Sequence, residues 1–170
     1  KAGVLAAAGD YGAAEKELAV AMRLDPDSVD VMQEAARLHF MLKRYDKAAA
    51  SWDRYATLVE TDIASGGLLI TCYTALGDRA NVERVAQRTM ARAEKAVATD
   101  ADNGSAMATI FSCLLCLGET ERAKEWARRA VLIDPDNLGM RYNLACDFVV
   151  AVHDHDMALE PTVFYMVGES

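Results

Sequence analysis

The sequence predicts an all-α protein, a solenoid in which antiparallel helix pairs stack side by side. The composition is one observation behind this prediction: 52% of the 170 residues are hydrophobic, with only 3 prolines and 10 glycines. This balance is typical of a packed helical protein. The second observation is that two different sequence marks recur at 34-residue steps. A helix pair that repeats in this way buries its apolar face only by stacking on its neighbours.

One mark lies at the end of a pair, where three segments read alike: 24–28 (LDPDS), 99–103 (TDADN) and 133–137 (IDPDN). Positions 101 and 135 are 34 residues apart. Pro26 and Pro135 end the helices before them. We expect the next helices to begin at N-caps supplied by Asp27/Ser28 and Asp136/Asn137.

The other mark lies at the turn inside each pair. The turns are Gly9-Asp10, Lys43-Arg44, Gly77-Asp78 and Gly118-Glu119, and positions 9, 43 and 77 are successively 34 residues apart. Five residues beyond each turn stands a small or apolar residue, which lets two helices approach closely: Ala14, Ala48, Val82 and Ala123. The end segments and the intra-pair turns follow the same 34-residue spacing, and together they define the register of the repeat.

From this register and the apolar periodicity we predict the helices in order. The first helices of the pairs span about 2–8, 29–42, 62–76, 104–117 and 138–152. The second helices span about 11–24, 45–59, 78–100, 119–133 and 155–166. Positions 26 and 101 differ by 75, which is 34 plus 41, and the seven extra residues fall in 78–100, where no glycine or proline occurs. The third pair is therefore predicted to have a second helix about 10 Å longer than the others.

These residues resemble the tetratricopeptide repeat (TPR) family. Ala123, Ala130 and Pro135 match its second-helix pattern. Its first-helix pattern is matched by Leu69 together with Tyr73, and by Leu144 together with Phe148. Glu60 and Ala101 stand where the family usually has proline. The resemblance implies a single right-handed superhelical solenoid. Its expected repeats are about 1–28, 29–62, 63–103 (with the long second helix), 104–137 and 138–170.

The resemblance also implies that the first helices line a concave groove that receives a partner polypeptide. The expected concave positions are mostly small, neutral or apolar: Asp30, Gln33, Arg37, Phe40; Ala64, Gly67, Thr71, Thr74; Ser105, Ala108, Ser112, Leu115; Gly139, Tyr142, Cys146, Val149. The lysine and asparagine clamp of TPR co-chaperones is absent, which argues against binding of a chaperone tail. The groove suits an apolar helix or strand, or is filled by neighbouring segments of the same protein. The candidate partner-binding residues are Gln33, Arg37, Phe40, Thr71, Tyr142 and Asn143.

Other features could carry chemistry, but each has a simpler interpretation. Cys113 and Cys116 form a lone pair in a helix, whereas a structural zinc site needs four ligands; with Cys72 and Cys146 they are expected to be small core thiols. The sequence His153-Asp154-His155-Asp156 is expected to cap a helix in solvent rather than to hold a cation. We therefore predict no cofactor and no metal.

Two further patterns have a structural and a functional interpretation. Gly66 and Gly67 inside a predicted helix either pack tightly against a neighbouring helix, which we favour, or admit a ligand. A basic stripe on the long helix either forms a solvated convex face or receives an acidic segment: Arg84, Arg88, Arg92 and Lys95.

Charge and motifs limit the function. With 18 basic and 26 acidic residues the net charge is −8, which argues against binding to nucleic acid or to an anionic membrane. The sequence has no transmembrane stretch, signal peptide, phosphate-binding loop or nucleophile motif, so we predict a cytoplasmic protein that is not an enzyme. We expect a scaffold for protein–protein interaction.

An alternative is a regulatory or oligomerisation segment of a larger bacterial signalling enzyme. Residues 92–104, 117–119 and 141–146 resemble the C-terminal TPR regions of bacterial adenylate/guanylate cyclases. Because Lys1 is not methionine and Ala2–Ala8 resembles the middle of a helix, we expect the sequence to be part of a longer chain. The apolar run 162–167 is expected to promote self-association of exposed solenoid ends.

Overall fold

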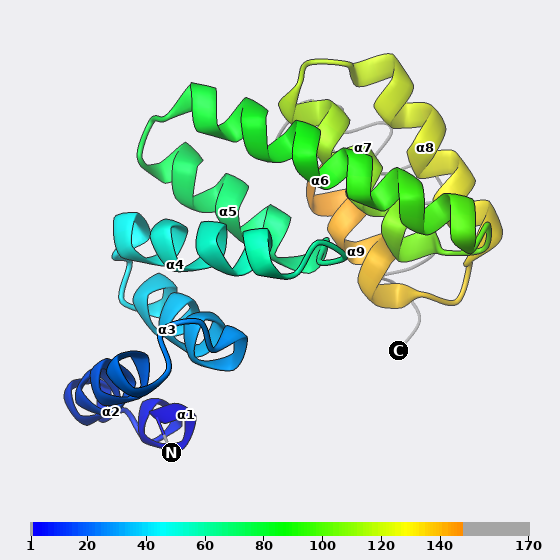
Figure 1. The fold of residues 1–170 in the computed structure, drawn as a ribbon. Coiled ribbons are helices and arrows are strands. Elements are labelled where there is room, and N and C mark those ends of the chain that lie inside the picture. Colours follow the sequence, from blue (N-terminus) through cyan, green and yellow to red (C-terminus); the bar gives the residue numbers. More distant parts are fainter. Residues whose placement is uncertain (1, 148–170) are drawn as a thin grey trace. The chain divides into compact units, whose positions relative to one another are not determined.

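The computed structural model describes residues 2–147 (Figure 1). Within this range the regular structure is entirely α-helical, and the helix ends up to the start of α9 lie within two residues of the predicted ones. The helices are α1 (Ala2–Ala7), α2 (Tyr11–Leu24), α3 (Val29–Met41), α4 (Tyr45–Leu58), α5 (Ala64–Ala75), α6 (Arg79–Thr99), α7 (Gly104–Cys116), α8 (Thr120–Ile133) and α9 (Leu138–Asp147). The predicted all-α fold is confirmed, whereas the predicted helix 155–166 lies outside the described residues.

The chain divides into two compact units, Lys1–Val82 and Glu83–Ser170, with the division inside α6. In the N-terminal unit, α1 packs on α2, α3 packs on both and on α4, and α4 packs on α5 (Figure 1, blue to green). In the C-terminal unit, α7 packs on α8 and on α9. Each unit therefore contains antiparallel helix pairs, while the five repeat boundaries in one solenoid stay a prediction.

All four predicted intra-pair turns adopt the same backbone conformation. Gly9, Lys43, Gly77 and Gly118 have positive φ angles of 81°, 56°, 70° and 80°. The N–H of Lys43 donates to the carbonyl of Phe40, and the N–H of Arg44 donates to the carbonyl of His39, both at 2.9 Å. The other three turns repeat this pair of bonds. It is the Schellman ending of a helix, which needs a left-handed residue and explains glycine at three of the four positions.

Small residues occupy the predicted close approaches between helices. Ala14, Ala48 and Ala123 have no exposed surface, and Val82 is buried as well. All four residues lie five positions beyond a turn, so their burial agrees with the predicted helix crossings. The predicted long second helix is also confirmed, since α6 has 21 residues whereas α2, α4 and α8 have 14 each.

The helix starts agree only partly with the predicted caps. The side-chain oxygen of Asn137 accepts a hydrogen bond from the N–H of Met140 at 3.0 Å, as a capping residue should. Ser28 precedes α3 but makes no side-chain capping bond. The carboxylate of Asp27 pairs instead with the guanidinium of Arg54 at 2.5 Å. Ser28 is therefore the N-cap residue of α3, as predicted, but it lacks the side-chain bond of a cap, and Asp27 contacts α4 instead of capping α3.

None of the described helices combines the length and apolar character that a bilayer span needs.

Candidate functional site

The N-terminal unit contains an open pocket of about 320 Å³ between α3, α4 and α5. Three of the sequence-predicted partner-binding residues, Gln33, Arg37 and Phe40, line it together. They share one side of α3 because they are spaced at helical intervals. The pocket lining consists of Gln33, Arg37, Phe40 and Met41 of α3, Trp52 of α4, and Ala64, Ser65 and Leu68 of α5.

Aromatic packing holds the inner wall of this pocket in place. Trp52 is almost completely buried, and the ring of Phe40 meets it edge-on with 5.5 Å between centroids. Phe40 makes a second edge-on contact with Tyr45 at 5.7 Å. Such pairs fix ring orientation in addition to burying apolar area. Phe40 is thus a fixed, half-buried part of the pocket wall.

The rim of the pocket leaves apolar side chains in solvent. Met41 is 56% exposed and Leu68 is 37% exposed. Both lie where α3 and α5 face the same opening. An open pocket with exposed apolar residues at its rim is suited to bind an apolar side chain of another molecule.

The α5 side of the pocket begins at a small hydrogen-bonded cap. The hydroxyl and the N–H of Ser65 both donate to the carboxylate of Asp62. Further along α5, the hydroxyl of Thr71 donates to the carbonyl of Gly67 at 2.9 Å. Thr71 is exposed but does not line the pocket.

Gly66 and Gly67 have different surroundings. Gly66 is buried, in agreement with helix packing. A Cβ atom placed on Gly67 would have no neighbour within 4 Å, so the prediction that Gly67 packs tightly against another helix is wrong. Its missing side chain instead leaves the surface of α5 open.

We expect Gly67→Ala to raise the free energy of unfolding by about 0.5–1 kcal/mol, because the methyl group meets nothing and glycine is unfavourable inside a helix. Urea denaturation measures the change. Gly104→Ala is the matched control with the opposite sign, since its Cβ would lie 2.6 Å from the Cβ of Asp134. Destabilisation by Gly67→Ala would show that α5 needs this glycine.

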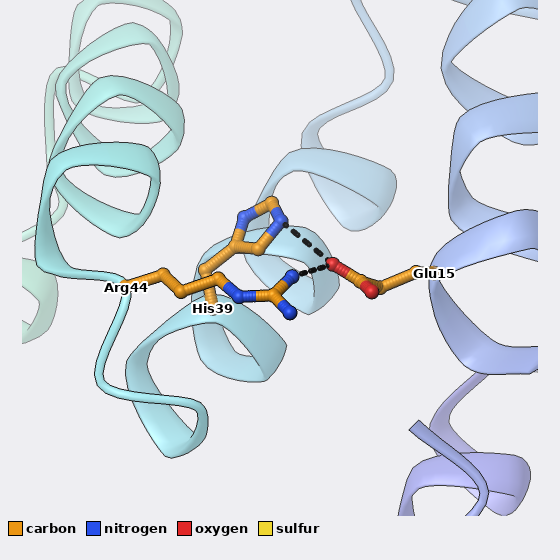
Figure 2. Close-up of polar contacts among 3 residues, drawn as sticks. All are labelled: Glu15, His39 and Arg44. Carbon is orange, nitrogen blue, oxygen red and sulfur yellow. Dashed lines mark hydrogen bonds and ion pairs between the residues drawn. The ribbon is translucent and has the colours of Figure 1, made fainter. Parts of the chain in front are cut away.

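A polar cluster that sequence reasoning missed links α2, α3 and the turn before α4 (Figure 2). The carboxylate of Glu15 pairs with the guanidinium of Arg44, and its Oε1 lies 3.8 Å from Nε2 of His39. Burial lowers the pKa of His39, an effect that Glu15 opposes. A histidine whose pKa is lower in the folded than in the unfolded state stabilises the fold at higher pH. That stabilisation is lost as the pH falls through the lowered pKa.

In the C-terminal unit, the predicted concave positions are partly used for internal contacts. The hydroxyl of Ser112 on α7 donates to the carboxylate of Asp147 on α9. Burial raises the pKa of Asp147, and the bond from Ser112 opposes this. Tyr142 and Asn143 on α9 are exposed, and the hydrogen bond with Cys146 raises the pKa of Tyr142.

Two of the four cysteines, Cys72 and Cys113, are buried core thiols as expected, whereas Cys116 and Cys146 are only half-buried, so the expectation is wrong for these two. Burial raises the pKa of Cys72 to about 11, and burial together with Cys116 and Asp147 raises the pKa of Cys113 to about 12. Both thiols are therefore protonated at neutral pH, as core residues are. Within residues 2–147 no cluster of three or more histidine, cysteine or acidic residues could hold a metal ion. The segment 153–156 lies outside this range.

The basic stripe on α6 is only partly exposed. Arg84 and Lys95 are exposed, whereas Arg88 and Arg92 are half-buried. The expectation of a wholly solvated face is thus not met at these two residues, and Arg84, Arg88 and Arg92 each interact with other groups.

Comparison with known proteins places this arrangement among TPR structures. Residues 5–56 match the tetratricopeptide repeat family. The chain superposes on a crystal structure of MamA with a TM-score of 0.63 and 14% identity, covering 97% of this chain and 91% of MamA. For YrrB, described as "a TPR protein with an unusual peptide-binding site", the TM-score is 0.62 and the identity 16%, with coverage of 99% and 84%.

A third similar structure is TTC0263, a thermophilic TPR protein of Thermus thermophilus, with a TM-score of 0.62 and 18% identity. The match covers 99% of this chain and 89% of TTC0263. No curated protein matches the sequence. The predicted TPR-type solenoid fold is confirmed, and the repeat family is supported, whereas none of these comparisons supports a nucleotide-cyclase context.

Proposed function

We propose that this TPR-fold chain is a protein–protein interaction scaffold, which binds a segment of a partner polypeptide in the pocket of its N-terminal unit. The observation that carries the proposal is that Gln33, Arg37 and Phe40, selected from the sequence, line one open pocket with Met41 and Leu68. The pocket combines a fixed aromatic wall, an exposed apolar rim and two polar side chains. The aromatic wall and the apolar rim supply affinity for a bound segment, and the polar side chains orient it.

Two further observations support the proposal. The similar fold of YrrB is described as having a peptide-binding site, although the likeness at 16% identity extends to the fold alone. Helix α5, which lines the pocket, also has an open surface at Gly67 and an exposed Thr71, so a bound segment has room to continue along this helix. We propose Thr71 as a peripheral contact, and Tyr142 and Asn143 as candidate contacts of the C-terminal unit.

The test compares two substitutions that introduce the same charge at different places. Leu68→Glu puts a carboxylate at the pocket rim, whereas Leu24→Glu puts one at the 82% exposed end of α2, outside the pocket lining. We expect Leu68→Glu to weaken binding of a purified partner about tenfold or more, because an apolar contact is replaced by a charge that must be desolvated. Titration calorimetry measures the change.

Leu24→Glu is expected to bind like wild type, since only a solvated surface is altered. Equal binding by all three proteins would exclude the pocket as the site. Equal losses in both variants would show that the interaction depends on overall charge.

We also propose that the chain has no catalytic centre, works in the cytoplasm and self-associates through its ends. Residues 162–167, on which self-association was predicted, lie outside the described range. Assays of nucleotide turnover and sedimentation of the purified chain check the first and the last of these proposals. The alternative, a regulatory or oligomerisation segment of a bacterial signalling enzyme, requires a catalytic domain elsewhere in the same protein.

A further inference from the structure

Arg37 lies between two pockets of the N-terminal unit. Besides the pocket of about 320 Å³ at α3–α5, a second pocket of about 200 Å³ is lined by α1, α2 and α3. Arg37 and Met41 line both pockets. The second pocket is otherwise mainly apolar, with Ala6, Leu18 and Leu38 in its wall. The two pockets thus share Arg37 and Met41, which lie one turn apart on α3.

The two pockets differ in the charged residues that line them. Among the described residues that line the larger pocket, Arg37 is the only charged one. Glu34 lines the smaller one, but its carboxylate is directed toward α1, since a Cβ on Gly3 would meet its Oε2 at 3.0 Å. Arg37 is exposed, and within the described residues its guanidinium makes no hydrogen bond or ion pair. Arg37 is therefore a cation without an ion-pair partner at the edge of two mainly apolar pockets.

A guanidinium in this setting fits a carboxylate. Its planar set of donors binds both oxygens of a carboxylate side by side, and apolar surroundings strengthen such a pair when a ligand excludes water. The chain as a whole carries a net charge of −8, so a polyanion such as nucleic acid is repelled. One carboxylate is attracted locally, because salt screens the more distant charges within about 8 Å.

We propose, on the basis of the proposed function, that the bound segment is a peptide with one acidic residue flanked on both sides by apolar residues. The carboxylate of the acidic residue pairs with Arg37. One flanking apolar side chain enters the larger pocket between Phe40 and Leu68, and the other enters the smaller pocket between α1 and α3. Gln33, at the edge of the larger pocket, supplies amide hydrogen bonds to the peptide backbone.

Selection of a phage-displayed library of random 12-residue peptides on the 170-residue chain tests this proposal. We expect the enriched peptides to share an acidic residue with apolar residues on both sides. Fluorescence anisotropy with one labelled peptide should show that Arg37→Glu raises its Kd about tenfold or more, because attraction becomes repulsion. Arg23→Glu, the same substitution at an exposed position of α2, is the control and should leave the Kd unchanged.

A charge exchange makes the test specific. Replacing the acidic residue of the peptide by lysine should abolish binding to wild type and restore it to the Arg37→Glu protein. A merely structural role of Arg37 would not produce this rescue.

The outcomes separate the two proposals. Enriched peptides without an acidic residue would contradict the proposed acidic partner. So would peptides whose Kd is unchanged by Arg37→Glu but raised by Leu68→Glu. Either result would leave the pocket as the binding site. Peptides insensitive to both substitutions, or a library without enrichment, would overturn both proposals.

Discussion

Trp52→Ala is expected to lower the free energy of unfolding by about 3–5 kcal/mol, because it removes the largest fully buried side chain in residues 2–147. The indole lies on α4, which packs against both α3 and α5, and only 1% of its surface is exposed. Removal leaves a cavity and takes away the edge-on partner of Phe40. Urea denaturation followed by far-UV circular dichroism measures the loss without relying on tryptophan fluorescence.

The other tryptophan of the chain supplies the control. Trp126 on α8 is only half-buried, and the guanidinium of Arg129 lies 5.1 Å from its ring centre. Trp126→Ala should therefore cost much less, about 1 kcal/mol for the lost cation–π contact and some apolar area. Equal losses in the two variants would mean that Trp52 is not the centre of the N-terminal core.

This expected loss explains why Trp52 is a poor probe of binding although it lines the pocket. A variant that unfolds the N-terminal unit also loses its pocket, so reduced binding would not identify a contact. Leu68 and Arg37 are better probes because both side chains are exposed and contribute less to the core. The residues that form the pocket and those that recognise a partner are thus partly different.

The backbone of the fold was predictable because few interactions determine it. A helix that ends in a left-handed residue and turns back requires glycine or a tolerated substitute, so the turns recur visibly at 9, 43, 77 and 118. Lys43 adopts the same conformation without being glycine, and only the 34-residue step identified it. Small residues at fixed distances from these turns identified the helix crossings.

The candidate site was predictable only in part. The helical register placed Gln33, Arg37 and Phe40 on one side of α3, and they line one pocket. The register could not show that Arg37 also lines a second pocket, since this depends on the packing of α1. Nor could the register find the cluster of Glu15, His39 and Arg44. His39 and Arg44 lie 24 and 29 positions after Glu15, and neither separation matches the 34-residue repeat.

The helix crossing between α7 and α8 in the C-terminal unit has no room for a larger side chain. Ala123, Ala127 and Ala130 follow one another along the buried face of α8 at helical spacing. Their small size lets α8 approach α7, whose buried side chains are bulky and include Ile110, Phe111 and Leu114. Ala123 has no exposed surface, so the three extra carbons of leucine must displace one of the two helices.

Ala123→Leu is therefore expected to lower the free energy of unfolding by about 1–3 kcal/mol through overpacking. Ala91→Leu is the control, since Ala91 is exposed on α6 and the same change there should stay within about 0.5 kcal/mol of wild type. Parallel urea titrations of the three proteins measure both effects. If Ala123→Leu unfolds together with wild type, Ala123 does not lie at the crossing, and the register that also places the turn at Gly118 is wrong. If both variants lose stability equally, the cost comes from leucine itself rather than from the close contact of α8 with α7.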